Sequence, residues 1–134
     1  MTAPATIEVG IYQKLKTTDV IFALVRERIY PVVAPQNAAR PYVVYERINA
    51  IRISALTSDT DMAHGTWRIS AYAETRDEAV NLGNEVRKAL QRYKGTISDQ
   101  TFEDVFVVNQ LDVYDDLDHL HHVGYDFDIW YRET

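Results

Sequence analysis

The chain has 134 residues, of which 46% are hydrophobic and 25% charged, with no cysteine and a formal net charge of −6. This length fits one globular domain, residues 1–134, that buries roughly two-thirds of its unfolded surface. The composition excludes disulfides and thiolate metal sites, and no apolar run approaches the ~18 residues of a membrane span.

The N-terminal third predicts two short helices followed by two strands. Thr6 is a suitable cap for a helix whose apolar residues, from Ile7 to Leu15, recur on one face, and a helical turn follows near residues 20–25. Residues 28–33 and 41–49 are β-type runs separated by a polar loop. Prolines interrupt or precede both runs, which places these strands at the margin of a sheet because proline cannot donate to a ladder.

Residues 50–64 predict a long hairpin with its tip at Ser58–Asp61, followed by a strand over Gly65–Ala73 in which apolar and polar residues alternate. Three apolar residues of this segment, Ile51, Ile53 and Leu56, fit either the core or a patch between subunits. We favour the patch between subunits, with Arg52 included in it.

The next segment predicts a helix over 76–92. Thr75 and Glu78 form a capping box, apolar residues repeat at helical spacing, and Gly95 is a suitable left-handed stop. Two strands follow, at 105–113 and 123–131. The sequence thus predicts an α+β fold: a twisted, mostly antiparallel sheet of about four to five strands with helices packed on one face.

The charge is divided unevenly along the chain. Residues 99–134 carry 10 acidic residues and one base, Arg132, whereas residues 1–98 are net basic. Tight binding to a phosphate backbone needs clustered lysine and arginine, so the sequence disfavours a nucleic-acid-binding protein. The acidic end is interpreted as a solvated face; the alternative is a surface that docks a basic partner or lets DNA pass without sticking.

One cluster has the residue types for metal chemistry. It comprises Asp112, Asp115, Asp116, Asp118, His119, His121 and His122. The residues His119 and His121 would point the same way on a strand and share an ion, but their spacing matches neither an EF-hand loop nor HExxH. We interpret the cluster as a solvated hairpin tip at a subunit contact, and we expect no catalytic residue, metal or cofactor.

The carboxylates Asp126 and Asp128 flank Phe127 and would share the polar face of the last strand, where ordinary exposure explains them. Trp130 shares that face and needs some cover. Because tryptophan is enriched at protein interfaces, we expect Trp130 to contact another subunit or a partner.

Five stretches together resemble one family. They are RIYPVVAPQNAARPYVVYERI, HGTWRISAYAET, RDEAVNLGNEVRKALQRY, NQLDVYDD and the terminal GYDFDIWYRE. Their order and spacing are similar to those of the small tail-completion proteins of long-tailed bacteriophages, also called tail terminators or head–tail joining proteins. The resemblance spans about Ile7 to Glu133.

The resemblance implies a structural virion protein made in the bacterial cytoplasm. Such a protein forms a ring, hexameric in this family, on the head-proximal end of the tail tube. There it stops polymerisation, meets the head connector and lets DNA pass through the lumen. The alternatives are another neck or tube subunit, or a small metal-dependent enzyme using the Asp115–His122 cluster. The interface residues we expect are Ile51, Arg52, Ile53, Leu56, Asp115, Asp116 and Trp130.

Overall fold

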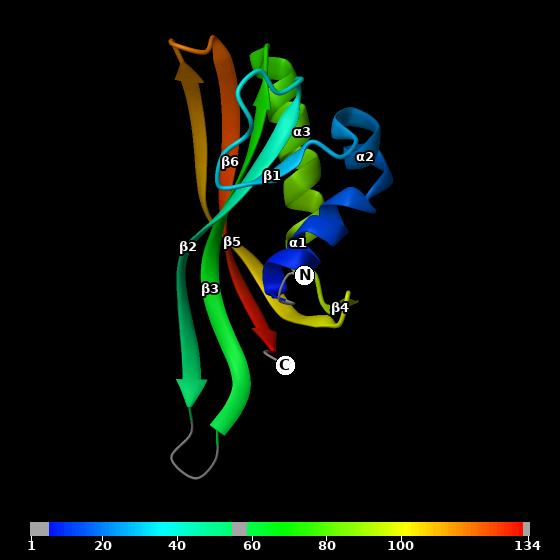
Figure 1. Ribbon diagram of the computed structural model, residues 1–134. Coiled ribbons are helices and arrows are strands. Elements are labelled where there is room, and N and C mark those ends of the chain that lie inside the picture. The colour runs from blue at the N-terminus through cyan, green and yellow to red at the C-terminus, as the bar shows by residue number, and fades with distance from the viewer. Residues whose placement is uncertain (1–5, 55–58, 133–134) are drawn as a thin grey trace.

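A computed structural model describes residues 6–54 and 59–132 (Figure 1). The helices are α1 (Ile7–Lys16), α2 (Asp19–Val25) and α3 (Arg76–Leu90). The strands are β1 (Ile29–Pro31), β2 (Tyr42–Ser54), β3 (Asp59–Ala73), β4 (Gly95–Ile97), β5 (Gln100–Asp115) and β6 (Leu120–Arg132). None of the helices in these ranges has the length and hydropathy to cross a membrane.

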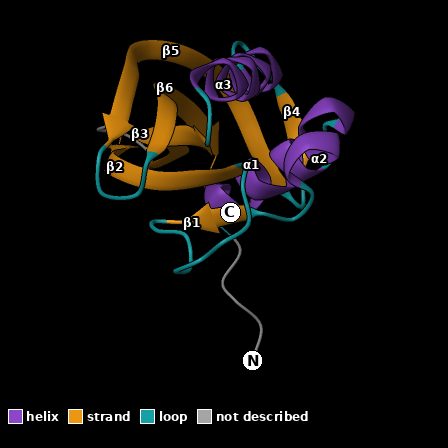
Figure 2. Ribbon diagram, turned by 90° about the horizontal axis from the view of Figure 1, so that it is seen from above, coloured by secondary structure: helices purple, strands orange, loops and turns teal. Residues whose placement is uncertain are grey.

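The strands form one sheet in the order β1-β2-β3-β6-β5-β4. Strands β2, β3, β6 and β5 are successively antiparallel, whereas β1 runs parallel to β2. The sheet is curled, and the helices gather on one side of it (Figure 2). This confirms the predicted α+β class with helices on one face, but the described residues form six strands where four to five were expected.

The unpredicted strand, β4, has three residues and pairs with the start of β5. The two strands are joined by Ser98 and Asp99, whose φ angles are 51° and 65°. Two consecutive positive φ angles are typical of the tight turns that join antiparallel strands. A strand of this length carries too few residues to show an alternating pattern, so the sequence contains no signal for it.

The core lies between the helices and the sheet. The residues Val123, Tyr125, Phe127, Ile129 and Tyr131 of β6 are all buried, as their alternation predicts. From α1, Ile11 and Leu15 reach the same core, and α3 adds Leu82 and Val86. Trp67 of β3 is 1% exposed and stands near the middle of the sheet, where its ring meets Tyr131 edge to face.

The predicted helix 76–92 is confirmed, but its stop is not where the sequence placed it. The helix ends at Leu90, and Arg92, with a φ of 62°, makes the left-handed turn expected of Gly95. Gly95 instead opens β4. The Thr75 half of the predicted capping box is present, because the Oγ1 of Thr75 accepts a hydrogen bond from the backbone N–H of Glu78 at 3.2 Å.

Replacing Thr75 with alanine should therefore lower the free energy of unfolding by about 1 kcal/mol, since a backbone donor of α3 loses its partner. The Thr6→Ala variant is the matched control. Thr6 occupies the same position before α1 but makes no capping hydrogen bond with its side chain, contrary to the sequence-based expectation. Urea denaturation of both variants checks this; equal effects would show that the Thr75 hydrogen bond adds nothing to stability.

The long hairpin predicted after residue 50 is formed by β2 and β3, which project beyond the end of β6 (Figure 1). Its tip was predicted too late in the chain. Strand β3 already begins at Asp59, so most of the expected turn, Ser58–Asp61, belongs to this strand.

Candidate functional site

The face of β2, β3, β6 and β5 that carries no helix is the candidate site, and we call it the helix-free face. Curling of the sheet shields its centre, so Ser70 and Asp126 are only 6% and 7% exposed. Gly124 lies beside Ser70 in the neighbouring strand, and a side chain there would come within 2.7 Å of the Ser70 Oγ. The expectation that ordinary exposure explains Asp126 is therefore wrong.

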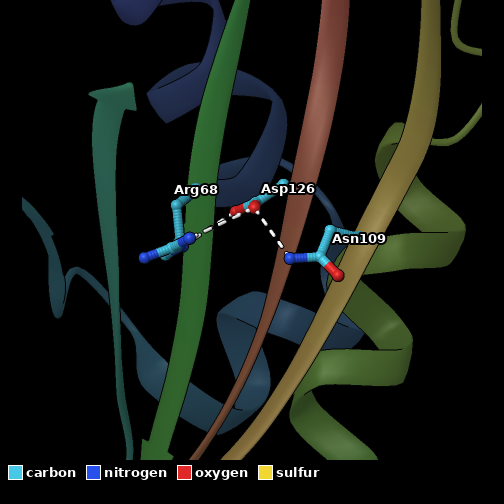
Figure 3. A network of polar contacts seen from close by, with 3 residues as sticks. All are labelled: Arg68, Asn109 and Asp126. Carbon is cyan, nitrogen blue, oxygen red and sulfur yellow. Dashed lines mark hydrogen bonds and ion pairs between the residues drawn. The ribbon is translucent and has the colours of Figure 1, made fainter. Parts of the chain in front are cut away.

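Asp126 is held in a three-residue polar network (Figure 3). The guanidinium of Arg68 donates to both carboxylate oxygens, from Nε at 2.8 Å and from Nη2 at 3.2 Å, and the Asn109 amide donates at 3.2 Å. These hydrogen bonds, led by the one from Arg68, lower the pKa of Asp126 despite its burial. The same contact raises the pKa of Arg68. The network joins β3, β6 and β5 through a charge pair that is satisfied within the chain.

Trp130 lies lower on the helix-free face, as its alternation predicts. The ring of His64, from β3, stacks on it with centroids 4.2 Å apart, and the His64 Nδ1 lies 3.4 Å from the Asp128 carboxylate. Much of the cover that the sequence required for Trp130 therefore comes from its own chain. The exposed edge of the indole leaves Trp130 as a candidate interface residue.

Aromatic side chains occupy the upper end of the helix-free face. Tyr42 stacks on Tyr72 at 5.0 Å, and Tyr72 meets His122 at 4.7 Å. Burial raises the pKa of both tyrosines and lowers that of His122, so the three groups are neutral at pH 7. They are therefore suited to apolar and stacking contacts.

A cleft of about 340 Å³ opens beside these aromatic residues. Its walls are Tyr42 and Tyr72, the loop 32–38, and Asp115 and Asp118 from the turn between β5 and β6. Val32 is 67% exposed and has a φ of 65°, which is unusual for a β-branched residue. The cleft therefore has an apolar rim on the loop and an acidic wall on the turn.

The predicted metal cluster is dispersed. Asp112 pairs with Arg76 of α3. The Nδ1 of His119 hydrogen-bonds to the hydroxyl of Tyr114, and the ring of His121 lies against the Tyr114 ring. His122 lies against Tyr72 on the helix-free face. Across residues 6–54 and 59–132, no three His, Asp or Glu side chains converge in a geometry suited to a metal ion. The metal-dependent alternative therefore has no assembled site in the described residues.

Three acids of the acidic C-terminal third pair with arginine or lysine from elsewhere in the chain. Asp104 pairs with Arg92 and Lys94, Asp112 with Arg76, and Asp126 with Arg68. Within the described residues, the acids Asp115, Asp116 and Asp118 of the β5–β6 turn have no cationic partner. This turn therefore remains acidic, and it also carries Leu117, which is 90% exposed.

The expected interface residues lie in three separate places. Ile51, Arg52 and Ile53 belong to the projecting part of β2, and Leu56 lies outside the described residues. Asp115 ends β5 at the opposite end of the molecule, with Asp116 next to it, and Trp130 lies on β6 (Figure 1). The sequence analysis missed two exposed apolar residues of the strands, Ile48 and Val108, since nothing in their local pattern marks them as exposed. It also left out Leu117, which lies in the predicted solvated tip.

The comparisons with known proteins agree with the expected family. Residues 9–132 match the family described as "Tail completion protein gp17". No curated protein matches the chain. One solved structure with the same fold is a chain from the "Virion of native gene transfer agent (GTA) particle"; it is 19% identical, 91% of each chain is covered, and the TM-score is 0.76.

The match covers nearly the whole chain, which places it among phage structural proteins of the virion tail. The chain belongs to the tail completion protein gp17 family. The resemblance found in the sequence is thereby confirmed.

Proposed function

We propose that the protein forms a hexameric ring on the head-proximal end of the tail tube, stops tube polymerisation and joins the tail to the head connector. Its partners are then further copies of itself, the tail tube protein and a head completion or connector protein. The observation that carries this proposal is the family match over residues 9–132, because a tail completion protein acts where tube growth ends.

The surface of the molecule supports a role in assembly. The β5–β6 turn presents Leu117, 90% exposed, among three carboxylates with no cationic partner in the described residues. Val113 and Tyr114, shortly before this turn, are also exposed, and a group of exposed apolar side chains with a charged rim is typical of a docking surface. The unpaired carboxylates also repel phosphate, which suits a ring whose lumen passes DNA without binding it.

Adding the purified protein to polymerising tail tube protein tests the proposal. We expect mean tube length, measured by electron microscopy, to fall as the ratio of this protein to tube protein rises, because each ring blocks one growing end. Tubes of unchanged length would contradict the proposal. Long tubes formed by this protein alone would instead identify it as a tube subunit.

A Leu117→Asp variant with a Val80→Asp control extends the same assay. Val80 is exposed on α3, outside the β5–β6 turn, and should tolerate the charge. If the turn docks a partner, Leu117→Asp should lose most of the effect on tube length or the binding of the head connector, while Val80→Asp keeps both. If the two variants affect tube length and connector binding equally, the turn is not part of the docking surface.

A further inference from the structure

The cleft beside Tyr42 and Tyr72 is built from three separate parts of the chain. One wall is the loop 32–38 between β1 and β2, and another comes from the turn between β5 and β6; both lie at the upper end of the molecule (Figure 1). Val44 and Leu120, 7% and 3% exposed, line the cleft from the sheet. Its volume of about 340 Å³ is at the lower end for ligand pockets and suits one or two side chains of another molecule.

The loop wall has a defined shape. The Val32 N–H donates to the Tyr45 carbonyl at 2.8 Å, and the Ala38 N–H donates to the Pro35 carbonyl at 3.0 Å. The φ of Asn37 is 66°, and a positive φ at the third of the four turn residues is typical of a type II turn. These hydrogen bonds hold Val32 at a φ that a β-branched residue rarely adopts. The wall is therefore formed without a partner.

Stacked aromatic residues form the side of the cleft nearest the sheet. Tyr42 and Tyr72 both line the cleft, and their ring centroids lie 5.0 Å apart. Tyr30 meets Tyr42 edge to face at 6.0 Å, and His122 lies against Tyr72, so both tyrosines are held by neighbouring rings. Aromatic rings fixed in this way attract cations, and the planar guanidinium of arginine stacks on them.

The β5–β6 turn supplies negative charge to the cleft. Asp115 and Asp118 line it and have no cationic partner in the part of the chain that the structure describes. The Asp115 Oδ1 accepts hydrogen bonds from the backbone N–H groups of Leu117 and Asp118, at 2.9 and 3.3 Å, so Oδ2 is left for a donor from outside. Arg40 also lines the cleft, but the carboxylate of Glu74 lies 3.5 Å from its guanidinium. The balance of charge around the cleft is therefore negative.

The carboxylates and the aromatic rings lie close enough to act on each other. Burial is the main cause that raises the pKa of Tyr42; Arg40 lowers it, and Asp118 and Asp115 raise it further. Burial also raises the pKa of Tyr72, and Asp115 adds to that shift. A cation bound in the cleft would therefore meet a tyrosine ring and a carboxylate at once.

We propose that this cleft receives an arginine side chain of another virion protein. The guanidinium stacks against the tyrosine pair and binds the carboxylates of Asp115 and Asp118. Arginine fits better than lysine, because its planar group stacks on aromatic rings and pairs with a carboxylate through two donors. Val32 and Val33, 67% and 73% exposed, would contact apolar residues on either side of the arginine. This inference rests on the proposed docking role of the β5–β6 turn and names the chemistry of the segment that docks there.

Titration of the isotope-labelled protein with capped tripeptides, followed by amide chemical shifts, tests the site. The peptides are N-acetyl-Val-Arg-Val-amide and its lysine and glutamine counterparts. We expect the arginine peptide to shift the amide signals of Val33, Asn37 and Asp118 to saturation, the lysine peptide to bind more weakly and the glutamine peptide to cause no shift. Equal shifts with arginine and glutamine, or none with arginine at millimolar concentration, would overturn the proposal.

An Asp118→Asn variant with an Asp116→Asn control separates the cleft from the general charge of the turn. Asp116 belongs to the same turn and has the same charge, but it does not line the cleft. We expect Asp118→Asn to weaken binding of the arginine peptide about twofold to fivefold, the effect of losing an exposed ion pair, and Asp116→Asn to leave it nearly unchanged. Equal losses in the two variants would show that only overall charge attracts the peptide, and the site would be wrong.

A second copy of the chain is the other occupant that the titration can detect. If the same amide signals shift when the protein concentration alone is raised, a second copy fills the cleft and the assignment to another protein is overturned.

The cleft and the terminator role fail in different ways. If the arginine peptide binds in the cleft while tube growth is unaffected, the site stands and the terminator role is wrong. If tubes are capped but the peptide does not bind, the site is wrong and the terminator role stands.

Discussion

Replacing Arg68 with methionine is expected to lower the free energy of unfolding by about 3 kcal/mol, because it leaves a shielded carboxylate without its cation. The Asp126 side chain is only 10% exposed, whereas that of Arg68 is 34% exposed, so this figure lies at the lower end for a broken buried pair. Arg47→Met is the control, since Arg47 is exposed and has no ion pair in the described residues. We expect Arg47→Met to change the free energy of unfolding by no more than about 0.5 kcal/mol.

The effect of Arg68→Met should also depend on pH. The pKa of Asp126 is lowered below its ordinary value of 3.8, chiefly by the hydrogen bond from Arg68. A lowered pKa contributes stability that is complete above the unfolded-state value and is lost as the pH falls through the folded-state value. The difference between wild type and variant in denaturation midpoint should therefore be largest at neutral pH and narrow below about pH 4. A difference independent of pH would show that Arg68 stabilises by packing alone.

Replacing Trp67 with alanine is expected to cost about 3–5 kcal/mol, at least as much as the loss of the Arg68 guanidinium. The ring is 1% exposed and fills the middle of the core. Trp130→Ala is the matched control: it removes the same side chain from the helix-free face, where the ring remains partly exposed against His64. Trp130→Ala should lower the free energy of unfolding clearly less than Trp67→Ala does.

Trp67→Phe adds a second comparison at the same position. The Trp67 indole N–H is buried and finds no hydrogen-bond partner in the described residues, so phenylalanine removes an unpaired donor along with some volume. Trp67→Phe should therefore lower the free energy of unfolding much less than Trp67→Ala does. Thermal denaturation followed by circular dichroism measures the three variants. A Trp130→Ala effect equal to that of Trp67→Ala would contradict the assignment of the core to the helix-bearing face.

Local patterns predicted the elements whose signals lie within a few residues. The capping box at Thr75 and the helical spacing that follows it identified α3, and strict alternation identified the buried face of β6 from Val123 to Tyr131. These signals were sufficient because each element buries one face along its whole length.

Features that depend on contacts between distant residues were not predictable. The curl of the sheet encloses Asp126, and its partner Arg68 is 58 residues away in the chain. The charge imbalance between the two parts of the sequence is likewise partly offset through pairs such as Arg76 with Asp112. The register shifts at Ile48, between β2 and β3, and at Val108, between β5 and β6, leave no mark in the sequence, because each residue continues an ordinary β-type run.

Electron microscopy of the purified protein, alone and bound to tail tubes, tests the central claim most directly. We expect closed rings that cap one end of each tube. A stable dimer that leaves tube ends bare would contradict the account.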